Sequence, residues 1–384
     1  MKKLFSTHNR KKLAVSSALV SFLALAAIVG IVASVSASSG VGSAQSLGAG
    51  SGAVYIMDNN ASGNNVWAYP RYSDGQLGSA EGPYSTDGLG TGSALATQGA
   101  VVLTQDNHWL LVVDAGSNQI SVFKAQGASL ELASITGSQG PDPISLTVSG
   151  NWVYVLDGGN STQAPNIAGF TLSNGELTAI PGSVQGLSGL SGPSPEQIGF
   201  NPQGNVLVVT EKGTNIIDTY TVNSKGVESA PFSQASAGTG PYGFAFTRNG
   251  QLIVSEAASD SVSSYSVSKA GNLTIISGAL PTFGNAPCWL EIDGNTNLAF
   301  TTNAHGGTIS SFSISRTSGL TLFSSVAAHT AIPALDIAFS QNSQFLYVHN
   351  GNMITGFQVY SDGSISSITS ANGIVSSASG LAAY

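Results

Sequence analysis

Residues 206–222 read VLVVTEKGTNIIDTYTV. An apolar run ends in the acid Glu211, a short turn containing glycine follows, and a run of alternating apolar and polar residues comes next. Two runs of this kind, separated by turn residues, are typical of paired antiparallel strands. The stretch therefore predicts two neighbouring strands, of which the first ends in a carboxylate.

The same pattern occurs seven times along the chain of 384 residues, with spacings of 56, 43, 54, 45, 47 and 47 residues. A period in the forties made of strands alone predicts the blades of a β-propeller. The apolar runs end in a small acid or amide each time, at Asp58, Asp114, Asp157, Glu211, Glu256, Asn303 and Asn350.

Each full repeat contains four candidate strands. A proline turn precedes a short strand such as QIGF, GFAF, LEI or DIAF, the apolar strand follows, and an alternating strand and a weaker outer strand come last. Four antiparallel strands per repeat are the plan of a propeller blade. We therefore predict an all-β, seven-bladed propeller over residues 53–384. Two longer connections, around residues 83–96 and 182–195, are Gly/Ser-rich and are expected to be surface loops.

The two ends of the repeat region complement each other. The first repeat begins with its second strand, AVYIMD, and residues 379–384, SGLAAY, resemble a first strand with nothing after it. Pairing them would complete the seventh blade and remove two exposed sheet edges, which are aggregation hazards. We expect the C-terminal strand to close the ring in this way.

The N-terminal segment differs from the rest. Five of the 12 basic residues precede an apolar stretch over residues 13–35. This arrangement in residues 1–37 predicts a secretory signal peptide, and the apolar core is also long enough to serve as an uncleaved membrane anchor. Residues 38–52 form a Ser/Gly linker by composition. Both alternatives place the propeller outside the cytoplasm, secreted or at the cell surface.

Composition excludes several partners. Without the leader, seven basic residues remain against 20 acids, a net charge of −13. Nucleic acid is excluded as a partner because its binding depends on Lys and Arg at the phosphates, and phosphorylated substrates are disfavoured for the same reason. We expect a monomer that binds a small lactone or sugar-like molecule or an extracellular protein, with a membrane contacted only through an uncleaved leader.

Cys288 is the only cysteine, so no intrachain disulfide can form.

Three stretches, GPYGFAFTRNGQLIVSEA, NAPCWLEIDGNTNLAFTTNAHGGTISSFSI and VLVVTEKGTNIIDTYTV, resemble the lactonase-type seven-bladed β-propellers. This family includes the propeller form of 6-phosphogluconolactonase and a carboxymuconate cyclase. The resemblance covers nearly everything after the linker and implies the propeller fold and lactone chemistry at the axis.

The family's catalytic pattern is matched only in part. Glu256 matches the family's glutamate. The positions of its histidine and of one arginine, each just after a turn proline, hold Glu196 and Tyr242 here, and Ala334 and Leu335 follow Pro333 where a further arginine is expected. Phosphate or carboxylate recognition favours Arg or Lys. The resemblance therefore points to a neutral or weakly charged lactone.

Two interpretations of the strand-end residues remain open. Each side chain can accept hydrogen bonds within its own turn, as Asp and Asn commonly do, or the set can face an axial pocket. Under the second interpretation, Glu256, Glu211 and His305 are the candidates for proton transfer. The candidate substrate-binding residues are Glu196, Tyr242, Trp289, Asp114, Asp157, Asn303 and Asn350.

No cofactor is expected and no metal ligands are assigned, although clustered oxygen ligands leave Ca²⁺ or Mg²⁺ open. Two functions are compatible with the sequence: an exported lactonase-like hydrolase acting at the axial face, and a non-catalytic extracellular propeller that binds a ligand or a protein.

Overall fold

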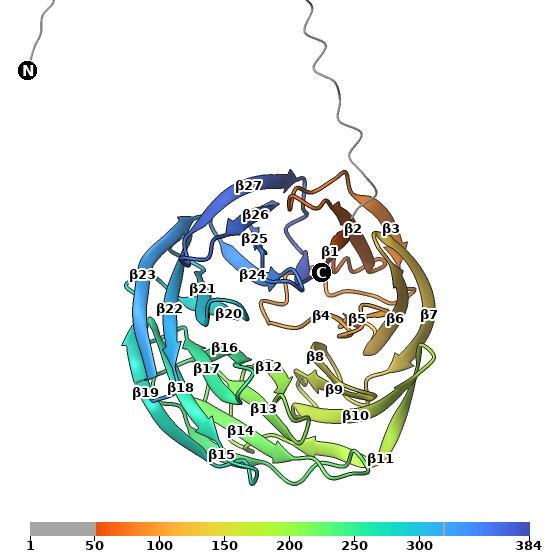
Figure 1. Cartoon of the computed structure of the whole chain (residues 1–384). Helices are drawn as coiled ribbons and strands as arrows, with labels where there is room; N and C mark the ends of the chain where they lie inside the picture. The colour runs from red at the N-terminus through yellow and green to blue at the C-terminus, as the bar shows by residue number, and fades with distance from the viewer. Residues whose placement is uncertain (1–50, 318) are drawn as a thin grey trace, which may run out of the picture. The chain divides into compact units, whose positions relative to one another are not determined.

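The computed structural model describes residues 51–317 and 319–384. This part of the chain folds into 28 strands, which form seven four-stranded antiparallel sheets arranged in a ring (Figure 1). The predicted all-β, seven-bladed propeller is confirmed. No helix that is long and apolar enough to cross a membrane occurs in the described ranges. The predicted leader and nearly all of the predicted linker lie outside them.

The strands occupy four positions in each blade, from the axis outward. The inner strands are β4 (Val101–Leu103), β8 (Pro143–Ser149), β12 (Pro195–Phe200), β16 (Pro241–Phe246), β20 (Pro287–Asp293), β24 (Ala334–Phe339) and β28 (Ser379–Ala383). The second strands are β1 (Gly52–Met57), β5 (Trp109–Asp114), β9 (Trp152–Asp157), β13 (Val206–Glu211), β17 (Gln251–Glu256), β21 (Leu298–Asn303) and β25 (Phe345–Asn350).

The third strands are β2 (Asn65–Arg71), β6 (Gln119–Gln126), β10 (Asn166–Ser173), β14 (Ile216–Thr221), β18 (Ser261–Val267), β22 (Thr308–Ser315) and β26 (Met353–Val359). The outer strands are β3 (Glu81–Ser85), β7 (Ser129–Gly137), β11 (Glu176–Gly186), β15 (Phe232–Ala235), β19 (Leu273–Pro281), β23 (Gly319–His329) and β27 (Ile365–Asn372).

The C-terminal strand closes the ring, as the sequence predicts. β28 pairs antiparallel with β1, placing Tyr55 opposite Ala382. The Arg71 guanidinium donates a 2.7 Å hydrogen bond from Nε to the Tyr384 carbonyl, and the rings of Tyr55 and Tyr384 stack with centroids 6.4 Å apart. The first blade is therefore assembled from both ends of the propeller, which leaves no unpaired inner edge.

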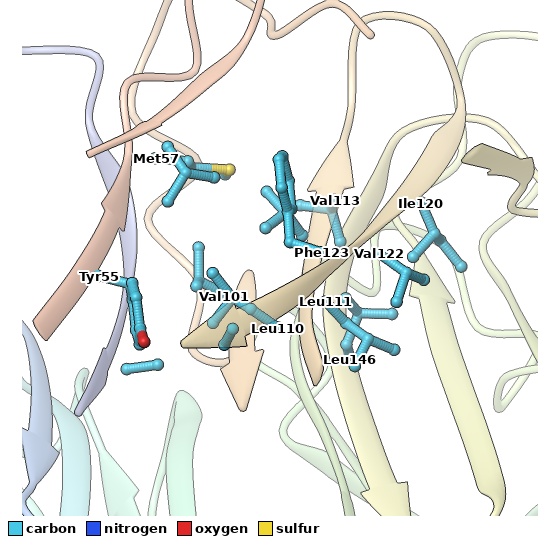
Figure 2. Packing of buried hydrophobic residues seen from close by; sticks show 14 of the residues in the cluster. Tyr55, Met57, Val101, Leu110, Leu111, Val113, Ile120, Val122, Phe123 and Leu146 are labelled. Atoms are coloured by element: carbon cyan, nitrogen blue, oxygen red, sulfur yellow. The ribbon is translucent and has the colours of Figure 1, made fainter. Parts of the chain in front are cut away.

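The core lies between neighbouring blades. The second strands are buried along their whole length in β1, β13, β17, β21 and β25, because each lies between an inner and a third strand and is covered on both faces by adjacent blades. Figure 2 shows one such cluster, in which Tyr55 and Met57 of β1 lie near Val101 of β4 and Leu110 of β5. The apolar runs that reveal the repeat are thus the core itself.

Candidate functional site

The strand-end residues of the repeats lie between blades rather than along the axis. Six of them end a second strand, and Asp58 directly follows one. All seven are buried, and none lines the axial cavity described below. The structure brings them to one end of the ring but not into one pocket.

Glu256, at the end of β17, is completely buried and surrounded by donors. Its Oε1 accepts from the hydroxyls of Ser236 and Ser263 at 2.8 and 2.7 Å and from the Gly238 amide at 2.7 Å. Its Oε2 accepts from the Ser261 hydroxyl at 2.7 Å. Ser236 and Gly238 precede β16, whereas Ser261 and Ser263 belong to β18. The carboxylate therefore links the third strand to the segment that leads into the inner strand, which we call the blade entrance.

Glu211, at the end of β13, has a similar role with different partners. Ser188 donates its amide to Oε1 at 2.9 Å and its hydroxyl to Oε2 at 2.8 Å, and the Thr214 hydroxyl also donates to Oε2. Asp218 of β14 lies beside it, and burial together with Glu211 raises the pKa of Asp218. Glu211 and Glu256 have no hydrogen-bond partner in common.

The acids Asp114 and Asp157 are also fully buried. Asp114 accepts from Asn64, from the Thr86 hydroxyl at 2.6 Å and from the Ser121 hydroxyl at 2.6 Å. Asp157 accepts from Asn166 at 3.2 Å, and its Oδ1 has no partner. Burial raises the pKa of Asp114, and it raises the pKa of Asp157 to about 7.

The two amides and Asp58 complete the set. Asn303 donates to the hydroxyls of Thr308 and Ser310 on β22, and Asn350 donates to Thr355 on β26. Only Asp58 bonds mainly within its own turn, accepting from the amides of Asn60 and Asn65. For Asp114, Glu211 and Glu256 the important partners come instead from the blade entrance.

A short pattern in the blade entrances explains this arrangement. Four of them carry a hydroxyl residue followed two positions later by glycine: residues 86–88, 138–140, 236–238 and 282–284. A Cβ on Gly238 would lie 2.2 Å from Glu256 Oε2, and one on Gly284 would lie 2.2 Å from Asn303 Cγ. The glycine therefore lets the backbone approach the strand-end side chain, and the hydroxyl bonds to it or lies beside it.

At this same end of the ring the chain covers the axis. The loop between β3 and β4 lies at the surface along much of residues 83–96, as predicted, but the residues that follow turn inward (Figure 1). The side chain of Gln98 donates to the Leu290 carbonyl at 2.9 Å and accepts from the Leu290 amide at 3.0 Å. Its backbone also bonds to Ser145 on β8 and to Glu196 on β12. Residues 96–98 thus form an axial plug that joins inner strands across the ring.

Three predicted binding residues contact this plug. The Tyr242 hydroxyl donates to the Ala96 carbonyl, and Trp289 Nε1 donates to the Thr97 carbonyl at 3.0 Å. Their rings pack edge to face with centroids 5.2 Å apart. Glu196 forms an ion pair with Lys212, yet burial outweighs that cation and raises the pKa of Glu196 to about 7. Each of the three is only 3 % exposed, because the plug covers the surface on which a ligand was expected.

The histidine candidate lies away from this cluster. His305 is exposed in the turn between β21 and β22, and its backbone amide donates to the Asn285 carbonyl at 3.2 Å. Nearby, Cys288 is buried, and burial raises the pKa of its thiol to about 12. A thiol with that pKa is protonated at neutral pH, so it is a packing group rather than a nucleophile.

An axial cavity of about 1230 Å³ lies on the other side of the plug. Gln98 and Gly99 close one end, the inner strands form the wall, and the turns after the inner strands surround the other end. Three half-buried phenylalanines occupy the last position of their inner strands and contribute to the wall: Phe200, Phe246 and Phe339. The lining contains no Lys, Arg or His.

Two acids on adjacent inner strands line this cavity. Glu291 of β20 is half-buried and accepts from Gln98 Nε2 at 3.2 Å. Asp336 of β24 is 3 % exposed; its Oδ1 accepts from the Ile337 amide at 2.8 Å, and its Oδ2 has no partner. Burial raises the pKa of Glu291 to about 7 and that of Asp336 well above its usual range, with the Glu291 charge adding to the second shift.

Sequence reasoning missed this acid pair. Glu291 and Asp336 lie in the strands LEI and DIAF, where an acid interrupts an otherwise apolar run. That interruption was the available signal, because perturbed carboxyls in a cavity are typical of functional sites. In the described ranges no group of three or more His, Cys, Asp or Glu side chains is arranged to hold a metal ion.

Comparison with known proteins supports the fold. No family model matches the sequence, and no curated protein matches it either. Among solved structures, a candidate 6-phosphogluconolactonase from Bacteroides fragilis is 17 % identical with a TM-score of 0.67, covering 87 % of this chain and 98 % of its own. A second candidate from Bacteroides uniformis is 14 % identical with a TM-score of 0.69, covering 85 % and 98 %.

The periplasmic gluconolactonase of Pseudomonas aeruginosa is similar to the same extent. It is 16 % identical with a TM-score of 0.65, and the match covers 86 % of this chain and 98 % of the other. At such identities the likeness concerns the backbone, since fold alone does not fix function. The chain therefore has the seven-bladed propeller fold of the lactonase-type proteins, as its sequence resemblance implied.

Proposed function

We propose that this chain is an exported β-propeller that binds a small organic molecule without negative charge in its axial cavity. The observation that carries the proposal is the lining of the cavity, which combines phenylalanine walls, amide groups and three acids with no basic side chain. Concave sites with apolar walls and a few polar groups are typical of small-molecule binding.

The charge of the site argues against a phosphorylated lactone. Phosphate recognition depends on Arg, Lys or oriented backbone amides. The lining offers no Lys, Arg or His, and its ionised acid Asp106, whose pKa is lowered by the Thr104 hydroxyl, would repel a phosphate. The other end of the axis, where the family's histidine and arginine positions hold Glu196 and Tyr242, is covered by the plug.

Export rests on the N-terminal sequence. A basic leader and an apolar stretch over residues 13–35 precede a Ser/Gly linker, which is the order found in exported or anchored proteins. Cell fractionation of the full chain tests this point. We expect the propeller in the medium or at the cell surface, and recovery with the cytoplasmic proteins would contradict it.

Ligand binding is tested by titration calorimetry of the full chain with gluconolactone, glucose, 2-phenylethylamine and 6-phosphogluconate. We expect at least one of the first three to bind and the phosphorylated acid not to bind. Ala245→Phe, which fills the cavity beside Phe246, should weaken binding at least tenfold, whereas the same change at the exposed Ala258 should not. Preferred binding of 6-phosphogluconate would overturn the proposal, and so would binding unaffected by Ala245→Phe.

A second candidate function is hydrolysis of a neutral lactone. The observation that favours it is the shared fold together with Glu291, whose raised pKa of about 7 suits a general base in the cavity. Release of the hydroxy acid from gluconolactone, above the spontaneous rate, is the measurement. Loss of turnover in Glu256→Gln alone would support the site inferred from the sequence, and loss in Glu291→Gln alone would assign the reaction to the cavity. Absence of turnover in the native chain would leave binding as the function.

A further inference from the structure

The acid pair at the plugged end of the cavity differs chemically from the strand-end acids. Glu291 and Asp336 come from neighbouring inner strands, β20 and β24, and the charge of Glu291 acts on Asp336. Both line the cavity, Glu291 half-buried and Asp336 3 % exposed. No basic residue of the lining compensates their charge.

Asp336 leaves one acceptor unsatisfied. Its Oδ2 is buried without a hydrogen-bond partner, although the residue is only 3 % exposed. An unpaired buried carboxylate oxygen costs the free energy of its lost hydration. A bound proton or a ligand with hydrogen-bond donors would recover that free energy.

The groups packed around the pair offer few donors. Gln98 gives one hydrogen bond to Glu291, and the backbone of Leu381 on β28 acts on Asp336 in favour of its ionised form without a hydrogen bond to Oδ2. Tyr242 of β16 lies close enough to Asp336 to interact with its charge, but its hydroxyl donates to the Ala96 carbonyl. The remaining titratable group of the lining, Asp106, is a third acid at the other end.

We propose that this end of the cavity binds an organic ammonium group between Glu291 and Asp336, with the body of the ligand against Phe200, Phe246 and Phe339. The inference rests on the proposed function and names the chemical class of its ligand. A primary ammonium carries three donors and no acceptor, so it can bond to both carboxylates and reach the free Oδ2.

An inorganic ion fits this site less well than an ammonium group. Ca²⁺ takes six to eight oxygen ligands, but the nearby amide oxygens are already engaged. Gln98 Oε1 accepts from the Leu290 amide, and Gln197 Oε1 accepts from the Phe244 amide at 2.7 Å. The cavity of about 1230 Å³ is also far larger than a single ion requires.

Ammonium binding should be linked to proton release. Burial raises the pKa of both carboxyls, so at pH 6 to 7 the empty site holds protons. A cation favours the ionised carboxylates and displaces these protons. Affinity for an ammonium ligand should therefore increase from pH 5.5 to pH 8.

Titration calorimetry of the full chain with 2-phenylethylamine and its neutral analogue 2-phenylethanol tests the inference. At pH 7 we expect the amine to bind at least tenfold more tightly, with proton release detected from the difference between two buffers of unlike ionisation enthalpy. Glu291→Gln and Asp336→Asn should each weaken amine binding at least tenfold and leave 2-phenylethanol unchanged. Glu131→Gln, on the exposed side of β7, is the matched control and should bind both as the native chain does.

The outcomes separate this inference from the proposed function. Equal affinity for the amine and the alcohol, or amine binding unchanged in both acid variants, would overturn the ammonium site while cavity binding stands. Calcium binding that is tighter than amine binding and lost in the same variants would overturn it in favour of a metal site. Failure of every probe, including the earlier panel, would overturn the proposed function itself. Unchanged binding of 2-phenylethanol shows that the variants are folded.

Discussion

Glu256 and Asp336 are both buried carboxyls with no cation beside them, and their surroundings are opposite. Glu256 accepts hydrogen bonds from two serines of its own blade's third strand and from Ser236 and Gly238 at the blade entrance. Asp336 accepts one from the Ile337 amide and leaves Oδ2 free. A carboxylate saturated by the protein holds the fold together, whereas one left unsaturated beside a cavity is available to a ligand.

The position of each residue in its blade explains the difference. A residue at the end of a second strand meets the segment that enters the inner strand, which supplies hydroxyls and amides at close range. Asp336, within an inner strand, lines the axial cavity, which separates it from the opposite strands. The protein's own donors therefore reach Glu256 and do not reach Asp336.

The largest effect is expected from Glu256→Ala. The change leaves the Gly238 amide and three hydroxyls without their acceptor, and each buried unpaired donor costs about 1–3 kcal/mol. We expect the free energy of unfolding in urea to fall by about 4 kcal/mol. The control is Glu131→Ala on the exposed side of β7. A native-like stability for Glu256→Ala would break the comparison.

Asp157 lies between these two cases, because its Oδ2 is hydrogen-bonded and its Oδ1 is not. Its contribution to the free energy of unfolding should depend on pH. Its folded pKa, raised to about 7, exceeds the unfolded value of about 3.9. The folded state therefore holds the Asp157 proton more tightly than the unfolded state does, and this preference stabilises the fold at low pH. The stabilisation is lost as the pH rises through the folded pKa of about 7. The amide side chain in the variant Asp157→Asn does not titrate, so the variant should not lose stability in this way.

Stability curves at pH 4 and pH 8 measure this effect. The variant should gain about 3 kcal/mol relative to the native chain between those two values, an order-of-magnitude figure from the linkage of one raised pKa. An equal difference between variant and native chain at both pH values would show that Asp157 has the same pKa in the folded and unfolded states.

Asp336→Ala should have a much smaller effect than Glu256→Ala. Only one hydrogen bond is lost, and a buried unpaired oxygen disappears with it. We expect the free energy of unfolding to change by about 1 kcal/mol or less, measured in urea at pH 7. A loss as large as that of Glu256→Ala would mean that Asp336 also holds the blades together.

His305→Ala should have the smallest effect. The side chain is exposed in a turn, and such changes alter stability by about 0.5 kcal/mol or less. Thermal unfolding measures this, and the same variant in the gluconolactone assay tests whether His305 takes part in proton transfer. Lost turnover at native stability would support the predicted role of His305 in proton transfer.

The repeat, its strands and the strand-end residues could be predicted from the sequence because they follow local periodicity. The closure of the ring by residues 379–383 could also be predicted, since each end of the propeller lacks the strand that the other provides. The hydroxyl and glycine pattern of the blade entrances was visible in the sequence, but its purpose appears only beside Glu256 and Asn303. The assignment of Glu256, Glu211 and His305 to catalysis stays a prediction.

The sequence by itself determined the seven blades, their four antiparallel strands and the acidic, cation-poor character of the propeller. The tertiary structure decided which acids are satisfied and which are not. Gln98 bonds to Leu290, 192 residues further along the chain, and this contact closes the axis above the cavity. Periodicity describes neighbours within a strand, whereas the supply of donors to a buried carboxyl depends on segments that meet only when the ring closes.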